Sequence, residues 1–427
     1  MESKKVGVIT IYFGALAGWV LDSFNISAMF LLIPVLASQF FSLNSTLAIV
    51  GTWSIATTTF VFRPIGGVFF GALGDKIGRK KTMIVTLVGL GMSVFFTGFL
   101  PNYSKIGIFA PLLLIVFRII TGFFAGGEYG SSAVIIQESV DKQKKGIWGA
   151  ALQAGFPIGY TFAAVIFLLL HYLLGKNFLE YGWRWMFWVG SVTALLGLIV
   201  RYRMPESALW EKTSQNKKIH KPLKEIFMRK RELSGLLTGI LVMTGIAWVY
   251  GLTLGFYPTI LSFHKFVLFP KFLYVVIVAI LSSLVGYILS GYISDKIGRK
   301  NTIIIYSITA IVFSVGLTYL ITHTLNFYEI VLFSSILAFI TTGIFGVVPS
   351  FLSEKFSTIV RNTGVGASFN GGFILGQWSL ALLLLIIKIS SSSFFILWGV
   401  FIIIGELMIL SSALFSKETH NTDLYDL

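Results

Sequence analysis

The stretch GALGDKIGRKKT at residues 71–82 returns as GYISDKIGRKNT at residues 291–302, with eight of the twelve positions identical. Each copy follows the second long apolar run of its half of the chain. Tandem halves of this kind are typical of transporters, whose substrate site lies near the middle of the membrane between the two halves. The repeat therefore predicts a membrane protein built from two related halves.

The composition agrees with a chain that lies mostly inside a bilayer. Of its 427 residues, 56% are apolar and only 12% are charged, whereas ordinary soluble domains contain about 25% charged residues. So few charges could not cover the surface of a soluble protein, which excludes a cytosolic enzyme, a secreted domain and a disordered chain. The absence of cysteine excludes disulfides, thiolate metal sites and a cysteine nucleophile.

Long apolar runs predict the fold class. A bilayer core about 30 Å thick needs roughly 20 helical residues to cross it. Runs of that length lie at roughly 7–34, 46–73, 82–100, 107–136, 146–174, 183–203, 233–260, 272–293, 302–321, 328–350, 362–387 and 394–415. Because these runs do not alternate with a period of two, a transmembrane β-barrel is disfavoured. We expect an all-α polytopic membrane protein with twelve spans, divided into a bundle at 1–203, a cytoplasmic linker at 204–232 and a bundle at 233–427.

The basic residues indicate how the chain is oriented in the membrane. There are 33 Lys and Arg against 18 Asp and Glu, a net charge of +15. With twelve crossings and a cytoplasmic N-terminus, 25 basic residues fall in cytoplasmic segments, 5 in outer loops and 3 within or at the edge of spans. This bias follows the positive-inside rule and predicts a cell-membrane protein with both termini in the cytoplasm. It also accounts for the positive charge without nucleic acid as a partner.

Two segments suggest other assignments at first. Lys4 and Lys5, followed by the small residues at 15–17, resemble a signal peptide, but the apolar run continues to Leu36. We therefore expect the first span to be retained. The basic segment at 211–232 suggests nucleic-acid binding, yet it lies between two spans, so we interpret it as a linker with a lipid-facing part.

The repeated motif has a physical interpretation of its own. Its glycines have the small-xxx-small spacing that allows helices to pack closely. Asp75 stands at the membrane edge before Lys76 and Arg79, where it can cap a neighbouring helix and join a charge cluster. A cluster that is either made or broken can act as a gate. Charges that only set the topology are the alternative interpretation.

The pattern G-x-x-x-D-K-x-G-R-K, present in both halves, resembles the signature loop of the major facilitator superfamily. Further stretches resemble its metabolite:proton and sialate/monocarboxylate:proton symporters: RPIGG at 63–67, RIITGFFAGGEYG at 118–130, QAGFPIG at 153–159, GWR at 182–184, RMPES at 203–207, EKFSTIVRNTGVG at 354–366 and NGG at 370–372. The resemblance covers nearly the whole chain and implies the major facilitator fold. It also implies a gating role for the following residues: Gly71, Asp75, Arg79, Gly291, Asp295, Arg299, Glu138, Glu354 and Arg361.

Ionisable residues inside spans are costly and by default indicate functional sites. The predicted spans contain Asp22, Arg63, Arg118, Glu128 and Glu406. Counted along each helix at about 1.5 Å per residue, Asp22 lies at the depth of Arg118, and Arg63 at the depth of Glu128. We expect these two pairs as hypotheses, because depth does not determine which way a side chain faces. Glu406 lies on a span that is usually peripheral in this fold, so we expect no functional role for it.

The first of these pairs can couple proton movement to conformation. A carboxylate in a low dielectric stays ionised only beside a cation, so Asp22 can take a proton when Arg118 moves away. Proton-coupled members of the superfamily place an Asp and an Arg in the same two helices, and the resemblance implies proton coupling by Asp22, Arg118 and Glu128. Permanent structural bridges are the alternative. Related carriers often have a second acid where this chain has Asn25, so different coupling or uniport is also open.

Polar and aromatic side chains within apolar spans are the candidates for substrate contact. Arg63 can hold a carboxylate with two hydrogen bonds. The other candidates are Asn25, Gln153, Tyr160, Trp248, Tyr250, Tyr257, Asn370 and Gln377. For the aromatic members, interfacial belts and helix packing are the alternative.

These features predict a secondary active transporter. We expect proton-coupled symport of a small organic anion by alternating access, in a monomer without cofactor or metal. Sugar or polyol transport on the same fold, as symport or uniport, is the second hypothesis. The sequence contains no GxxxxGK[ST] loop of an ATP-driven pump and neither a metal-ligand cluster nor a nucleophile elbow of a membrane enzyme. The tandem repeat with gating loops argues against a channel.

Overall fold

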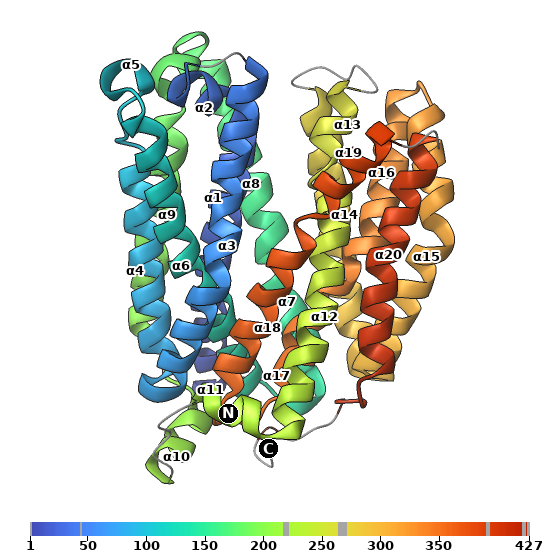
Figure 1. The fold of residues 1–427 in the computed structure, drawn as a ribbon. Helices are drawn as coiled ribbons and strands as arrows, with labels where there is room; N and C mark the ends of the chain where they lie inside the picture. The colour runs from blue at the N-terminus through green and yellow to red at the C-terminus, as the bar shows by residue number, and fades with distance from the viewer. Residues whose placement is uncertain are drawn as a thin grey trace.

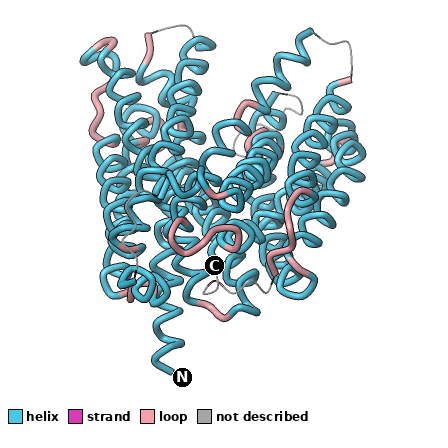
Figure 2. The backbone as a smooth tube through the Cα atoms, turned by 60° about the horizontal axis from the view of Figure 1, so that its bottom comes forward, coloured by secondary structure: helices cyan, strands magenta, loops and turns pink. Residues whose placement is uncertain are grey.

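The computed structural model describes residues 2–42, 45–216, 222–263, 271–389, 393–420 and 424, and in these ranges the regular structure is entirely helical (Figure 2). The helices of the first half are α1 (Glu2–Leu31), α2 (Ile33–Phe40), α3 (Ser45–Ile77), α4 (Arg79–Thr97), α5 (Tyr103–Ile106), α6 (Phe109–Ser139), η1 (Lys142–Lys144), α7 (Lys145–Gln153), α8 (Gly155–Leu174), η2 (Phe178–Gly182) and α9 (Arg184–Arg203). Between the halves lie α10 (Ala208–Asn216) and α11 (Pro222–Met228). The helices of the second half are α12 (Lys230–Leu252), α13 (Tyr257–Phe263), α14 (Lys271–Ile297), α15 (Arg299–His323), α16 (Phe327–Thr342), η3 (Gly343–Val347), α17 (Val348–Ser353), α18 (Arg361–Gly376), α19 (Ser379–Ile389) and α20 (Phe394–Leu414).

Within the described ranges, twelve helical segments are long and apolar enough to cross a membrane. Three of them are interrupted and consist of successive helices: Lys142–Leu174, Phe327–Ser353 and Arg361–Ile387. The prediction of an all-α polytopic membrane protein with twelve spans is confirmed. Part of the predicted linker, residues 217–221, lies outside the described residues.

The helices form two groups that stand side by side (Figure 1). The blue-to-green group contains α1–α9 and the yellow-to-red group contains α12–α20. Both chain ends lie at the same end of the molecule, which we call the terminal end. The predicted boundaries at 203 and 233 stay a prediction.

Each copy of the repeated motif turns the chain sharply between two spans. Gly78 joins α3 to α4 with φ of 110°, and Gly298 joins α14 to α15 with φ of 97°. Glycine adopts these backbone angles readily because it has no Cβ, whereas other residues are strained there. The motif therefore needs glycine at this position in both halves.

The first glycine of each motif copy marks a contact between the halves. A Cβ on Gly71 of α3 would run into the backbone of Thr363 on α18. In the same way, a Cβ on Gly291 of α14 would run into Gly146 and Ala150 on α7. Two crossings of opposite halves thus depend on a residue without a side chain, as the small-residue spacing predicts.

Candidate functional site

A buried ion pair joins α1 to α3. Arg63 donates through Nη2 to both carboxylate oxygens of Asp22, and each side chain is 1% exposed. The predicted pairing of Asp22 with Arg118 is therefore wrong for this structure. The two residues were matched by depth alone, whereas the partner of Asp22 depends on which neighbouring helix its face of α1 meets.

Arg118 on α6 is a buried cation without an ion-pair partner among the described residues. Its Nη2 donates to Asn25 Oδ1 at 3.3 Å, and its guanidinium carbon lies 5.9 Å from the centre of the Phe187 ring. Its Nε has no hydrogen-bond partner in the described part of the chain. A neutral amide and an aromatic ring are thus its neighbours in place of the expected carboxylate.

A second buried ion pair joins α6 to α9. Arg201 pairs with Glu128, and both side chains are fully buried. Arg201 Nε also donates to the backbone carbonyl of Gly14 at 2.8 Å, and Glu128 accepts from the Thr86 hydroxyl at 2.9 Å. The predicted Arg63–Glu128 pair is wrong, because Arg63 pairs with Asp22 instead. Sequence reasoning had counted Arg201 among the cytoplasmic loop charges.

One face of α1 organises all three arginines. Gly14, Gly18, Asp22 and Asn25 follow one another at spacings of three and four residues, so they lie on the same face of the helix. A Cβ on Gly18 would overlap both the carboxylate of Glu128 and the guanidinium of Arg201. Gly14 and Gly18 leave room for the Glu128–Arg201 pair. Further along the same face, Asp22 pairs with Arg63 and Asn25 contacts Arg118.

A small cleft lies beside Arg118. Its walls come from α1, α3 and α6 and consist of Asn25, Ile26, Met29, Phe30, Ala56, Thr59, Phe60 and Arg118. Asn25 Nδ2, the Thr59 hydroxyl and Arg118 Nε have no hydrogen-bond partner among the described residues. Asn25 Nδ2 and Arg118 Nε can only donate a hydrogen bond, and the Thr59 hydroxyl can donate one as well. The cleft encloses only about 10 Å³, about the space that one water molecule needs, so an anion could accept from these donors only if the cleft widened. Thr59 was missed by sequence reasoning.

The other predicted lining residues lie apart from this cleft. Trp248 Nε1 donates to a backbone carbonyl of α20 at 2.8 Å, and the Tyr257 hydroxyl donates to one of α16 at 2.8 Å. Asn370 Nδ2 donates to a backbone carbonyl of α6 at 2.9 Å, across the two halves. Tyr160, Tyr250 and Gln153 are buried, and Gln377 is half-buried. Substrate contact by these seven residues stays a prediction.

Glu406 on α20 is buried at 1% exposure and is not in an ion pair within the described ranges. Its Oε1 has no hydrogen-bond partner there. It does not line the cleft beside Arg118, and the expectation that it has no functional role stays a prediction.

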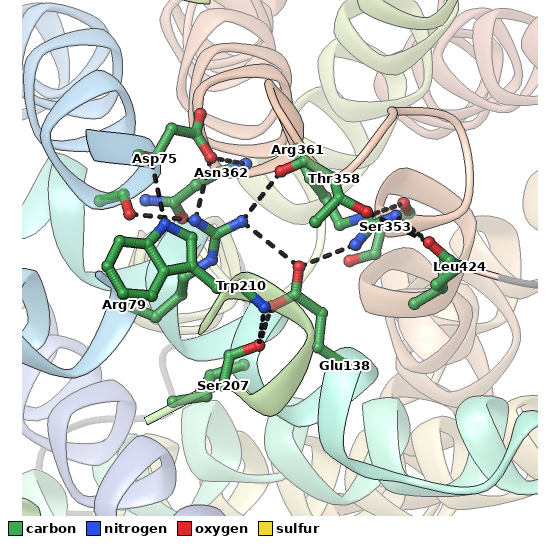
Figure 3. Close-up of polar contacts among 12 residues, drawn as sticks. Asp75, Arg79, Glu138, Ser207, Trp210, Ser353, Thr358, Arg361, Asn362 and Leu424 are labelled. Atoms are coloured by element: carbon green, nitrogen blue, oxygen red, sulfur yellow. Dashed lines mark hydrogen bonds and ion pairs between the residues drawn. The ribbon is translucent and has the colours of Figure 1, made fainter. Parts of the chain in front are cut away.

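A set of polar residues joins the two halves at the terminal end (Figure 3). This set, the terminal-end cluster, comprises Asp75, Arg79, Glu138, Thr358, Arg361, Asn362 and Thr363. Glu138 of α6 accepts from Arg79 at 3.3 Å and from Arg361 of the second half at 2.7 Å. Arg79 also donates to the backbone carbonyl of Thr358 at 3.1 Å. These buried contacts hold the halves together at this end.

Each motif aspartate caps a helix of the opposite half. Asp75 accepts from the backbone N–H groups of Asn362 at 3.2 Å and Thr363 at 2.9 Å, at the start of α18. Asp295 accepts from the backbone N–H groups of Gly146 at 2.7 Å and Ile147 at 2.8 Å, in the first turn of α7. Arg299 pairs with Asp295 at 2.7 Å and with Glu354 at 3.1 Å. Helix N-termini favour such negative groups. The gating role of these residues stays a prediction.

An acidic residue after the last span of each half completes the arrangement. Glu206 accepts from the first two backbone N–H groups of α4 at 3.0 and 3.1 Å, and Glu418 does the same for α15 at 3.0 and 3.1 Å. The next residues, Ser207 and Thr419, donate to the buried glutamates of the two ion-pair sets at 2.5 and 2.7 Å. Sequence reasoning assigned no role to these four residues. The sequence did contain a signal for them: an acidic residue followed by a hydroxyl residue occurs after each set of six spans, as Glu206-Ser207 and as Glu418-Thr419.

The buried amine of Lys355 should make the stability of the protein depend on pH. It lies between the spans Phe327–Ser353 and Arg361–Ile387, and its Nζ donates to the Ser416 hydroxyl at 2.8 Å. Burial lowers its pKa to about 8, against the opposing effect of the Glu418 charge. In the unfolded chain this lysine has its ordinary pKa of about 10.4, so it keeps its proton up to a higher pH than in the folded protein. Stability should therefore rise by about 1–2 kcal/mol between pH 8 and 9.5. Unfolding temperatures of the detergent-solubilised protein measure it, and Lys355→Met should lose this rise. An equal rise in both proteins would contradict the prediction.

Comparisons with known proteins bear on the family and the fold of the chain. A sequence model described as Major Facilitator Superfamily matches residues 16–377. A putative metabolite transport protein from Haemophilus influenzae is 33% identical, with 92% of each chain covered. The glycine betaine/proline/ectoine/pipecolic acid transporter OusA from Dickeya dadantii is 28% identical, covering 88% of this chain and 76% of OusA. The solved proton:xylose symporter XylE bound to 6-bromo-6-deoxy-D-glucose matches with a TM-score of 0.78 over 99% of this chain and 98% of XylE, at 18% identity.

Proposed function

The chain belongs to the major facilitator superfamily, and from this premise we propose that it is a proton-coupled symporter of small carboxylate-bearing metabolites. The family and the relatives are membrane transporters of metabolites and not enzymes. The substrate class, the proton and the closer kinship to metabolite:proton symporters belong to the proposal.

The single observation that carries the proposal is the buried guanidinium of Arg118 without an anionic partner in the described chain. A buried charge is unfavourable unless it is paired. Beside it, Asn25 Nδ2 and the Thr59 hydroxyl are also free to donate. Once the cleft of about 10 Å³ widens, a substrate carboxylate there would supply the missing anion and accept from these groups, and such charge-assisted hydrogen bonds are strong.

Asp22 is the group proposed to carry the proton. It pairs with Arg63 and lies one helical turn from Asn25, which contacts Arg118. This region thus holds two buried guanidinium groups, Arg63 and Arg118, and Asp22 pairs with the first alone. When Asp22 takes a proton, it releases Arg63, and the substrate carboxylate restores the balance of charge. Binding of the proton and binding of the substrate then favour each other, as symport requires.

The names of the relatives support a carboxylate. The four compounds in the name of OusA each carry a carboxylate group. Relatives named as metabolite or proline/betaine transporters favour such osmolytes over sialate or simple monocarboxylates. The likeness to XylE, at 18% identity, concerns the fold and does not favour a sugar.

Alternating access would occur by rocking of the bundles at 1–203 and 233–427. The cleft beside Arg118 lies within the first bundle, and its Phe60 wall meets the second bundle, where the Phe60 and Phe373 rings stack. We assign the terminal end to the cytoplasm because the segments predicted to face the cytoplasm contain 25 basic residues and the predicted outer loops contain 5. The terminal-end cluster is then the cytoplasmic gate, closed in this structure. Inward opening has to break the Glu138–Arg361 contact and the two aspartate caps. A single chain contains all these parts, in keeping with a monomer in the cell membrane.

Uptake into proteoliposomes tests the proposal. Labelled proline, glycine betaine, lactate and xylose are supplied with and without an inwardly directed proton gradient. At least one carboxylate should accumulate, and the gradient should increase its accumulation. Transport of xylose alone would favour the second hypothesis, sugar transport. Accumulation that is the same with and without the proton gradient would contradict proton coupling.

Asp22→Asn should separate exchange from accumulation. The amide cannot release a proton, so gradient-driven uptake should fall to the level seen without a gradient, whereas counterflow exchange of the same substrate should persist. Both are measured in the same proteoliposomes, with Glu225→Gln on the exposed surface as the matched acid-to-amide control. Loss of exchange as well as accumulation would indicate a binding or structural role for Asp22.

A further inference from the structure

The segment that follows α20 folds back onto the terminal end. Beyond its cap on α15, it contacts the connection between α17 and α18: Ser416 accepts from Lys355 at 2.8 Å, and Thr419 donates to Glu354 at 2.7 Å. Both contacts are buried. The segment is therefore packed against the same connection that carries Thr358 and Arg361 of the terminal-end cluster.

Leu424 reaches the cluster itself (Figure 3). Its backbone carbonyl accepts from Arg361 Nη2 at 3.2 Å and from the Thr358 hydroxyl at 3.1 Å, and the residue is 2% exposed. The same two residues hold the first half: Arg361 donates to Glu138, and the Thr358 carbonyl accepts from Arg79. Leu424 thus contacts two of the residues of the second half that bridge to the first, Arg361 and Thr358.

This contact completes the hydrogen bonding of a buried guanidinium. Arg361 Nε donates to the backbone carbonyls of Ser353 and Phe356, Nη1 donates to Glu138, and Nη2 donates to Leu424. Buried donors without partners are costly. The C-terminal segment therefore favours the orientation of Arg361 in which Nη1 faces the opposite half.

We propose that Leu424 is a positioning residue of the cytoplasmic gate, and that its contacts hold Arg361 and Thr358 in the arrangement that keeps the gate closed. This inference rests on the proposed assignment of the terminal end as the cytoplasmic gate. It makes the contacts of Leu424 a latch: their loss favours inward opening, and their presence favours closure. The repeat does not predict it, because the first half ends in a linker between two spans.

A cysteine reporter measures the latch directly, since the sequence contains no cysteine of its own. Ser131 on α6 is fully buried at the cluster and accepts from Asn362 of the second half at 3.2 Å. Ser131→Cys changes the side chain little and should react with maleimide only when the halves separate at this end. The reaction rate then reports gate opening without knowledge of the substrate.

Two truncations form a matched pair in this background. A stop after His420 removes Leu424 but keeps the Ser416 and Thr419 contacts, and loss of hydrogen bonds to a charged group should raise the labelling rate roughly ten-fold. A stop after Leu424 keeps that residue and gives it a carboxylate beside Arg361, so labelling should stay at or below the full-length rate. Thr358→Val removes one donor without shortening the chain and should raise labelling by a few-fold.

An unchanged labelling rate after the shorter truncation, or an equal rise in both truncations, would overturn the latch. If the shorter chain fails to fold, the Thr358→Val result decides, and no change there would also overturn it. Labelling of vesicles of known sidedness with an impermeant maleimide checks the orientation separately. The labelling rates do not depend on the outcome of the carboxylate uptake assay. A failure of the symport proposal can therefore be told apart from a failure of the latch proposal.

Discussion

Arg118→Gln is expected to lower substrate affinity and gradient-driven uptake by about 100-fold or more while leaving the protein folded. Each hydrogen bond to a charged group contributes about 1.5–3 kcal/mol, and the substrate carboxylate is proposed to accept from this guanidinium. Arg118 has no carboxylate partner in the described chain, so its replacement leaves no buried anion unpaired. Removal of an uncompensated buried charge should keep or raise the unfolding temperature. Affinity is measured as substrate-induced stabilisation, together with uptake.

Two further variants sharpen this test. Arg118→Lys keeps the charge but loses the planar pair of donors, and an intermediate loss of affinity, on the order of ten-fold, is expected. Arg63→Gln is the matched control for structure, because it leaves Asp22 buried without its cation and should lower the unfolding temperature. Equal destabilisation by Arg118→Gln and Arg63→Gln, or normal uptake by Arg118→Gln, would contradict the proposed substrate site.

The fold was predictable because its signals are local in the sequence. A span is recognised from a run of apolar residues, and the two halves from one repeated loop. The helix cap made by Asp75 also follows from the motif, since a carboxylate at a helix end needs backbone N–H groups. Gly78 and Gly298 belong to the same local signal, because the turn between spans requires their positive φ.

The pairing of the buried charges was not predictable in the same way. Depth along the membrane is one coordinate, and it matched Asp22 with Arg118. The partner also depends on the direction of each side chain around its helix, which tertiary packing determines, and Arg63 occupies that position. Arg201 stood at the end of a predicted span beside other basic residues, so it was indistinguishable from a charge that sets topology.

The cleft shows a second limit of sequence reasoning. Thr59 is one of several threonines in its span, and nothing in its spacing indicates that its hydroxyl is free. Conversely, Trp248 and Tyr257 stood out in the sequence as polar-capable groups in apolar spans, yet their polar atoms donate to backbone carbonyls. Whether a polar group is satisfied depends on distant segments of the chain. One local signal was available: Gly14 and Gly18 share a helix face with Asp22.

Glu128→Gln is expected to destabilise the protein severely. The side chain is fully buried with Arg201, which would keep its charge and lose its anion. Removing one partner of a buried ion pair costs about 3–5 kcal/mol, a large share of the stability of a typical domain. The yield of monodisperse protein and the unfolding temperature should both fall. Glu225→Gln breaks an ion pair whose side chains are 42% and 52% exposed, and should change stability by less than about 1 kcal/mol.

The double variant Glu128→Gln/Arg201→Met distinguishes a structural pair from a proton site. Replacing both charges removes the unpaired ion, so the unfolding temperature should recover most of the loss seen in the single variant. Folded double variant can then be assayed for uptake. If Glu128 takes part in proton coupling, substrate exchange should persist while the response to the proton gradient is lost or reduced. A normal gradient response would assign Glu128 and Arg201 a purely structural role in holding α1, α6 and α9 together, and would leave Asp22 as the acid of the coupling mechanism.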